Sequence, residues 1–171
     1  MNAALPRVAV VGVSSLIGAA VIDELRARKI ALAELHALDD ERSAGAPVAE
    51  DESLTVADVA AFDFSRVNLV FFCGRAALSE RYAQAAAAHA WVIDGSAAYR
   101  MRAEVPLVVA DVNAAVLNAV GRTGLIALPG SASVALATAL APLHRLAGLA
   151  AAHAIARPIK GAEAEAGVLL K

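Results

Sequence analysis

The stretch RVAVVGVSSLIGAAVIDEL, residues 7–25, decides the fold expected for this chain. It begins with an apolar, β-branched run, passes through a short loop of small residues from Gly12 to Gly18, and continues as an amphipathic helix. Glycines at both ends of such a loop let the backbone turn tightly and let the helix pack close to the strand. The pattern therefore predicts a strand, a loop and a helix whose N-terminus offers unpaired N–H groups to the phosphate of a nucleotide.

Ser15 is the position at which this loop departs from the usual pattern, because dinucleotide-binding loops commonly have a middle glycine there. A serine puts a side chain where the backbone and a pyrophosphate approach each other closely. A plain strand-to-helix turn without a ligand is the alternative interpretation.

Composition limits the class of protein. A chain of 171 residues suits one domain or slightly more. It is 59% hydrophobic with a mean hydropathy of +0.61, which favours packed helices and a filled core over disorder. A net charge of −2 gives no indication of a nucleic-acid or anionic membrane partner.

The single cysteine, Cys73, excludes an intrachain disulfide and a cysteine-based metal cluster. The N-terminus has no signal-peptide pattern, and the long apolar stretch over residues 125–156 is interrupted by Pro129, Pro142, His144 and Arg145. We therefore expect a cytoplasmic protein with no membrane span and no metal site.

Apolar runs alternate with helical patterns along the rest of the chain. We expect strands over residues 32–38, 54–56 (at a sheet edge), 68–73, 91–94, 107–109, 125–128 and 149–156, and helices over 79–90, 114–120 and 131–146. Ser79 is expected to cap helix 79–90, and Ser131 or Ser133 helix 131–146, which ends near Gly148. The alternation predicts an α/β fold with a doubly wound, mostly parallel, Rossmann-like sheet that binds ligands at the carboxyl ends of its strands.

Five segments match the motifs of one enzyme family in the same order. Residues 8–18 (VAVVGVSSLIG) match the family's V-A-V-V-G-A-T-G-x-V-G, and residues 40–45 (DERSAG) match S-E-R-S-A-G in all but the first residue. Residues 73–79 (CGRAALS), 92–100 (VIDGSAAYR) and 105–113 (VPLVVADVN) correspond to S-A-G-G-S-V-S, V-I-D-N-S-S-A-F-R and V-P-L-V-V-P-E-V-N. On these motifs the chain resembles the aspartate-semialdehyde dehydrogenase family, oxidoreductases of amino-acid biosynthesis.

The resemblance implies a site for NAD or NADP in three loops. The implied cofactor-binding residues are Gly12, Ser14, Ser15, Leu16, Ile17 and Gly18 in the first loop, Asp40, Arg42 and Ser43 in the second, and Cys73, Gly74 and Arg75 in the third.

The second loop carries a change that bears on the choice of cofactor. In the family, the serine and arginine of S-E-R-S-A-G hold the 2′-phosphate of NADP. Here Arg42 is kept, but Asp40 replaces the serine and lies between Asp39 and Glu41. Three carboxylates would repel a phosphate and accept a ribose hydroxyl, so NAD is expected to bind in preference to NADP. A solvated turn is the alternative interpretation.

The sequence leaves the roles of two arginines open. Arg75, with Ala76, replaces the paired glycines that line the cofactor in the family, and it either contacts a phosphate or blocks the cleft. Arg100 matches the arginine that grips the phosphate co-substrate in the family. A surface arginine in a salt bridge is the alternative for Arg100.

The family's catalytic cysteine lies in A-N-P-N-C-S-T, which corresponds here to residues 127–133 (ALPGSAS) and places Ser131 at the nucleophile position. A serine hydroxyl is a much weaker nucleophile than a thiolate unless a base activates it, and no histidine or carboxylate flanks Ser131. We therefore expect Ser131 to be inactive and to cap a helix. Cys73 is out of register with the nucleophile, and we expect it to be a small buried hydrophobic residue.

In the family, a substrate and dimerisation domain follows, with an acid/base histidine. We expect residues 1–148 to form the dinucleotide-binding domain and residues 149–171 to begin the second domain, with the chain ending just inside it. None of the four histidines (His36, His89, His144 and His153) matches the catalytic one.

Three functions stay open on this basis. The first is a non-catalytic homologue, a pseudoenzyme that keeps the nucleotide cleft. The second is a fragment of an NADP-dependent aldehyde oxidoreductase, and the third is a protein-interaction module. Bare apolar surface on helix 131–146 or segment 149–156 predicts a homodimer or another protein partner.

Overall fold

The computed structural model describes residues 4–48, 51–121 and 123–154 of the chain. One seven-stranded sheet runs through it in the order β3-β4-β2-β1-β5-β6-β7. The strands are β1 (Arg7–Val11), β2 (Glu34–Asp39), β3 (Pro47–Val48), β4 (Asp51–Asp58), β5 (Leu69–Phe72), β6 (Trp91–Asp94) and β7 (Gly124–Ala127). All neighbouring strands pair in parallel except β3, which is antiparallel to β4, so the doubly wound, mostly parallel sheet is confirmed.

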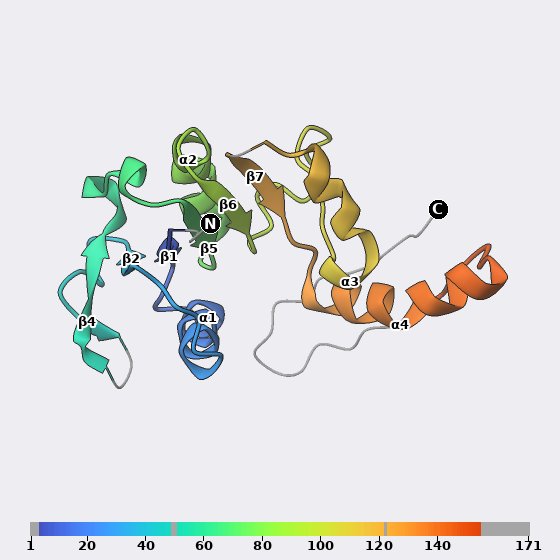
Figure 1. Ribbon diagram of the computed structural model, residues 1–171, viewed down its shortest axis with the longest axis horizontal. Helices are drawn as coiled ribbons and strands as arrows, with labels where there is room; N and C mark the ends of the chain where they lie inside the picture. Colours follow the sequence, from blue (N-terminus) through green and yellow to red (C-terminus); the bar gives the residue numbers. More distant parts are fainter. Residues whose placement is uncertain (1–3, 49–50, 122, 155–171) are drawn as a thin grey trace.

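Four α-helices connect or follow the strands. They are α1 (Leu16–Ala27), α2 (Ala76–Ala87), α3 (Ala110–Asn113) and α4 (Ser131–Ala147). Three short 3₁₀ helices lie between them: η1 (Val59–Ala61), η2 (Phe64–Arg66) and η3 (Ala114–Ala119). Figure 1 shows α1 on one face of the sheet and α2 on the other.

Strand β1 is buried on both faces because a helix covers each of them. Val8 and Val10 belong to the apolar cluster that contains Ile22 of α1. Ala9 and Val11 point to the opposite face and belong to the cluster that contains Ala83 of α2. Alternate side chains of a strand face opposite sides, so a centrally placed parallel strand needs an unbroken apolar run. This explains why residues 8–11 carry no polar side chain.

The loop after β1 requires glycine at two positions. Gly12 has φ +85°, in the left-handed region, and a Cβ atom there would collide with the backbone of Gly74 after β5. At Gly18, a Cβ atom would collide with the carbonyl group of Gly12 and the backbone of Val13. The two glycines therefore let α1 start close to the ends of β1 and β5.

The expected serine caps of the helices are wrong. Helix α2 begins three residues earlier than predicted and has Arg75 at its N-cap, while Ser79 is buried inside it. The Ser79 hydroxyl instead donates to the buried Asp94 carboxylate at 2.7 Å. Helix α4 has Gly130 at its N-cap with no side-chain cap, so neither Ser131 nor Ser133 caps it.

Several predicted strands also differ. The segment predicted as an edge strand over 54–56 is longer, and as β4 it lies between β2 and β3 rather than at the edge. Residues 107–109 form only an isolated bridge from Leu107 to Ala127. The Asn113 side chain accepts the N–H of Val109 at 2.8 Å and donates to the carbonyl of Leu107 at 2.9 Å, so these groups do not extend a ladder.

Residues 114–120, predicted as a helix, contain the 3₁₀ helix η3 after the short α3. The predicted strand over 149–156 is wrong where the structure describes it, because residues 149–154 are irregular, and its last two residues lie outside the described part.

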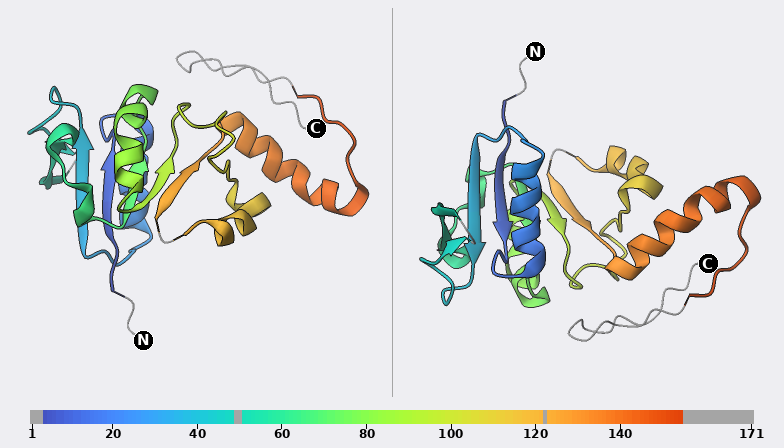
Figure 2. Two further views of the ribbon diagram at one scale, coloured as in Figure 1. Left: turned by 90° about the horizontal axis from the view of Figure 1, so that it is seen from above. Right: turned by 90° about the horizontal axis from the view of Figure 1, so that it is seen from below.

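Helix α4 lies beyond β7, at the end of the sheet away from β4 (Figure 2). It ends at Gly148, which has φ +65° in the left-handed region, close to the predicted end. Within the part of the chain that the structure describes, no residue of α4 is buried, and Leu146 is 87% exposed.

Gly12 and Gly45 form a matched pair for testing the close approach of β1 and β5. Both have φ +85°, but a Cβ atom at Gly45 meets nothing within 4 Å. Gly45→Ala should lower the free energy of unfolding by about 1–2 kcal/mol, the cost of a left-handed alanine. Gly12→Ala adds the collision with Gly74 and should cost about 1–3 kcal/mol more, as overpacking does. Urea unfolding of both variants measures these changes in the free energy of unfolding. Equal losses for Gly12→Ala and Gly45→Ala would show that the close approach of Gly12 to Gly74 does not constrain the fold.

Candidate functional site

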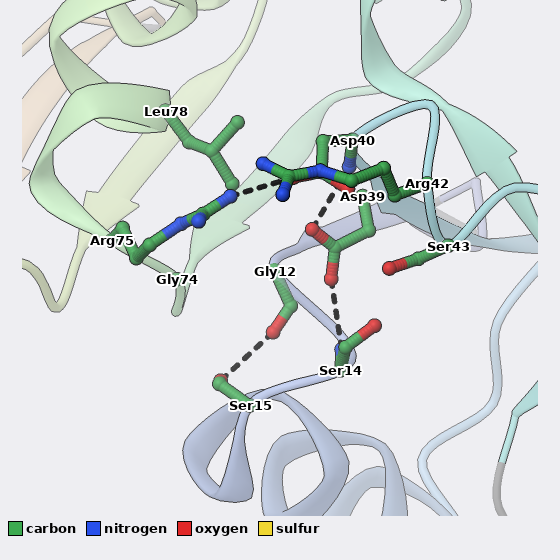
Figure 3. A pocket seen from close by; sticks show the side chains of 10 residues that line it. All are labelled: Gly12, Ser14, Ser15, Asp39, Asp40, Arg42, Ser43, Gly74, Arg75 and Leu78. Carbon is green, nitrogen blue, oxygen red and sulfur yellow. Dashed lines mark hydrogen bonds and ion pairs between the residues drawn. The ribbon is translucent and has the colours of Figure 1, made fainter.

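A groove opens where the carboxyl ends of β1, β2 and β5 meet. It contains a cavity of about 380 Å³, and Figure 3 shows the side chains that surround it. The lining residues are Gly12, Ser14, Ser15, Asp39, Asp40, Arg42, Ser43, Gly74, Arg75 and Leu78. Three loops far apart in the sequence therefore meet at one site, as the motifs predict.

Eight of the predicted cofactor residues line this cavity, and four do not. Leu16 and Ile17 lie in the exposed first turn of α1. Gly18 and Cys73 are buried. The first N–H groups of a helix have no acceptor within it, so the main chain of Leu16 and Ile17 is suited to an anion. Leu78 lies within the matched motif 73–79 but was not among the predicted cofactor residues, and it lines the cavity from the first turn of α2.

The Ser15 side chain stabilises the loop through hydrogen bonds to its main chain. Its Oγ accepts the N–H of Gly18 at 3.0 Å and so caps α1. Its hydroxyl lies 2.8 Å from the carbonyl of Gly12 and 2.9 Å from that of Cys73, two acceptors for its one proton. The serine therefore replaces the conformational freedom of a glycine with hydrogen bonds between the loop and the end of β5.

Asp39, the last residue of β2, connects two loops of the groove. It is buried, and its Oδ2 accepts the N–H of Ser14 at 2.9 Å while Oδ1 accepts the N–H of Asp40 at 2.9 Å. The carboxylate thus accepts one main-chain donor of the first loop and one of the second loop (Figure 3).

Asp40 lies between two arginines. Arg75 donates from Nη2 to Asp40 Oδ2 at 2.6 Å, and Nη2 of Arg42 lies 3.6 Å from the same oxygen (Figure 3). The charge balance expected from the sequence, three carboxylates around one arginine, left out Arg75. Arg75 comes from 35 residues further along the chain, so only the fold brings it to this loop.

A second cavity of about 450 Å³ lies beside the first and shares Asp40, Arg42, Arg75 and Leu78 with it. It continues toward the end of β4 and along α2. Its other lining residues are Glu41, Asp58, Val59, Ala60, Ala77, Arg81 and Tyr82.

Comparison with known proteins identifies the domain in which this groove lies. The family model described as "Semialdehyde dehydrogenase, NAD binding domain" matches residues 7–120, which include β1 through η3. The chain belongs to this family. The site described above therefore lies in the NAD-binding domain of a semialdehyde dehydrogenase relative.

Relatives of known sequence agree with this assignment. The chain is 40% identical over 141 residues to a USG-1 protein homolog of Azotobacter vinelandii, covering 81% of this chain and 42% of that protein. It is 33% identical over 144 residues to the aspartate-semialdehyde dehydrogenase of Legionella pneumophila, covering 83% and 42%. The chain thus spans less than half the length of these relatives.

Solved structures show the same fold. Aspartate-semialdehyde dehydrogenase II from Vibrio cholerae superposes with a TM-score of 0.78 at 29% identity, covering 84% of this chain and 44% of that one. A probable aspartate-semialdehyde dehydrogenase from Pseudomonas aeruginosa gives a TM-score of 0.76 at 35% identity, covering 82% and 42%. The Rossmann-like architecture is therefore that of the first part of these enzymes.

Arg100, expected at the co-substrate phosphate of the family, holds two loops together. Its Nε donates to the carbonyl of Leu128 at 2.9 Å, and one Nη donates to the carbonyl of Gly95 at 2.9 Å. These contacts join the segments that follow β6 and β7. In this semialdehyde dehydrogenase relative, part of the donor capacity of the guanidinium is therefore used within the fold.

Ser131, at the family's nucleophile position, is the first residue of α4 and is exposed. No histidine or carboxylate among the described residues is hydrogen-bonded to it. His144 lies on the same helix, but thirteen residues along an α-helix separate two residues by about 20 Å. The described residues therefore give Ser131 no general base.

Cys73 is buried at the end of β5, as expected, and burial beside Asp94 raises the pKa of its thiol to about 12. The desolvation of a thiolate is the main cause, and the negative charge of Asp94 adds to it. A neutral thiol is a poor nucleophile, so Cys73 does not replace the cysteine of the family.

Two further kinds of site are absent from the described residues. No group of three or more His, Cys, Asp or Glu side chains there is arranged to hold a metal ion. No helix in that same part is both long and apolar enough for a membrane crossing.

The raised pKa of Cys73 predicts slow thiol chemistry. The folded-state pKa lies above that of an unfolded thiol, so the thiol stays protonated between about pH 8.5 and 12, where an unfolded one ionises. At pH 8, native protein should react with an aromatic disulfide reagent at least about a hundred-fold more slowly than protein in denaturant. Absorbance of the released thiolate measures both rates, with Cys73→Ser as the blank. Equal rates would contradict the burial of this thiol.

Proposed function

We propose that this chain is a nucleotide-binding member of the semialdehyde dehydrogenase family that binds NAD(H) and lacks dehydrogenase activity. The observation that carries the proposal is the groove, in which loop 12–18 and the start of α1 face the ends of β2 and β5. A bound NAD(H) supplies hydride chemistry.

The residues of the groove fit a dinucleotide. The main-chain N–H groups of Leu16 and Ile17 at the start of α1 suit a pyrophosphate, and the close approach of Gly12 to Gly74 keeps side chains out of its path. The carboxylate of Asp40 at the end of β2 suits a ribose hydroxyl, which donates a hydrogen bond to it.

The charges favour NAD(H) over NADP(H). A 2′-phosphate beside Asp40 meets a carboxylate, and at about 4 Å in partly solvated surroundings each charge pair contributes roughly 1–4 kcal/mol. Arg42 and Arg75 oppose this repulsion, but both are already paired with Asp40. Asp39 and Glu41 add negative charge to the same loop. The charges around this site therefore disfavour the 2′-phosphate of NADP(H).

The lack of activity is argued from Ser131. The family's reaction needs a thiolate that attacks the aldehyde, and the hydroxyl of Ser131 has no base beside it among the described residues. The names of the relatives favour the alternative, that the chain is part of an aspartate-semialdehyde dehydrogenase of amino-acid biosynthesis. Ser131 counts against that alternative.

An interaction module is the second candidate function, and α4 favours it. This helix buries none of its residues in the described part of the chain and exposes Leu143 and Leu146 at its end. The predicted homodimer or protein partner would cover this apolar surface. The association stays a prediction, independent of whether the groove binds a nucleotide.

The cofactor preference is tested by calorimetric titration of the chain with NAD⁺ and NADP⁺ under identical conditions. We expect the tighter binding for NAD⁺, because the 2′-phosphate of NADP⁺ lies against the acidic loop 39–41. Tighter binding of NADP⁺ would refute the preference. Binding of neither would refute the cofactor proposal and favour the interaction module.

The absence of catalysis is tested with aspartate semialdehyde, phosphate and either oxidised cofactor. We expect the rate of cofactor reduction to equal that of a no-enzyme control. Ser131→Cys should not restore turnover, because a cysteine there still has no acid/base partner among the described residues. Turnover by the unmodified chain above the control would overturn the proposed inactivity. Turnover by Ser131→Cys alone would show that a suitable base is present after all.

A further inference from the structure

The ion pair between Arg75 and Asp40 separates the two cavities of the groove. Both residues line the 380 Å³ cavity and the 450 Å³ cavity, and Arg75 reaches across from the β5–α2 loop to the end of β2 (Figure 3). A molecule that extends from one cavity into the other must therefore pass this pair.

A dinucleotide extends in this way. In doubly wound folds the pyrophosphate lies at the N-terminus of the first helix, and the adjoining ribose lies at the end of the second strand. Here these places are the start of α1 and Asp40, both at the first cavity. Beyond Asp40 the second cavity is lined by Leu78 and Tyr82, whose apolar surfaces suit a base. The adenosine end of a dinucleotide bound in this way would lie against Arg75.

Arg75 can move without any change in the main chain. Its side chain is 66% exposed, it makes no cap hydrogen bond with α2, and Asp40 is the partner of its guanidinium in the described structure. Asp40 is less exposed, at 25%, and is also held by Arg42. Arg75, and not Asp40, is therefore the residue whose side chain can leave the ion pair.

We propose that Arg75 is a specificity-determining residue for the adenosine end of the cofactor, with opposite effects on the two nicotinamide dinucleotides. This inference rests on the proposed cofactor binding. In the protein without cofactor, the guanidinium of Arg75 is paired with the carboxylate of Asp40. A ribose 2′-hydroxyl competes with the guanidinium for that carboxylate, so the ion pair opposes NAD(H). A 2′-phosphate instead attracts the guanidinium away from Asp40, so Arg75 favours NADP(H).

Arg75→Ala tests this assignment because it should move the two affinities in opposite directions. NAD⁺ should bind up to about five-fold more tightly, since exposed ion pairs contribute little and their loss releases Asp40. NADP⁺ should bind at least about five-fold more weakly, because a cation near the 2′-phosphate is lost and Asp40 is left less compensated. The titrations are made at about 0.15 M salt. At this ionic strength, charges more than roughly 8 Å from Arg75, including the more distant pyrophosphate, are largely screened from it.

Arg28→Ala is the matched control. Arg28 is also an exposed arginine with a 2.6 Å ion pair, but its partner is Glu24 on α1, outside both cavities. This substitution should leave both affinities unchanged. Thermal unfolding of each variant checks that the fold is intact.

Asp40→Asn supplies the second variant, because it removes the carboxylate and keeps the shape of the side chain. NADP⁺ should then bind more tightly than to the unmodified chain. In this background, Arg75→Ala should no longer tighten NAD⁺, since no ion pair is left to break.

The outcomes separate the two proposals. Opposite shifts with Arg75→Ala, absent from Arg28→Ala and abolished for NAD⁺ by Asp40→Asn, support the assignment. Shifts in the same direction, or no shift while the cofactors still bind, overturn the role of Arg75 and leave cofactor binding standing. Binding of neither dinucleotide to any variant overturns cofactor binding and this inference with it.

Discussion

The close approach of the β1 end to the β5 end is the constraint on which the rest of the structure depends. Gly12 lies so near Gly74 that neither position accommodates a side chain pointing into the gap without displacing the other. This distance fixes where α1 starts, and the Ser15 hydroxyl then lies within hydrogen-bonding distance of a main-chain carbonyl at the end of each strand, to one of which it can donate. Asp39 adds the third connection, to β2. The groove is the space that these three junctions leave open.

The groove contains two adjacent aspartates that differ in burial and in their partners. Asp39 is buried and compensates main-chain donors, so its charge is committed to the fold. Asp40, one residue further, is partly exposed and is paired with two arginine side chains. Two adjacent aspartates thus have different surroundings because β2 ends between them, and Asp40 is the one to which we assign the proposed recognition.

The central part of the fold could be predicted from sequence because it depends on local patterns. The apolar run of β1, the glycines of loop 12–18 and the alternation of strands and helices each determine their own segment. Two positions that the sequence left wrong or open depend on partners distant in sequence. Ser79 looks like a helix cap until Asp94, fifteen residues later, is placed beside it. Arg75 likewise has an open role until the fold brings Asp40 to it from 35 residues earlier.

The exposure of α4 has a consequence for the helix itself. Helices in proteins gain stability mainly from the tertiary packing of one face. Helix α4 is seventeen residues long, loses a main-chain donor at Pro142 and has no buried side chain in the described part of the chain. The free energy that holds it helical therefore has little support from the sheet. We therefore expect α4 to open at a lower free energy than β1 and its neighbours, because few buried apolar contacts hold it among the described residues.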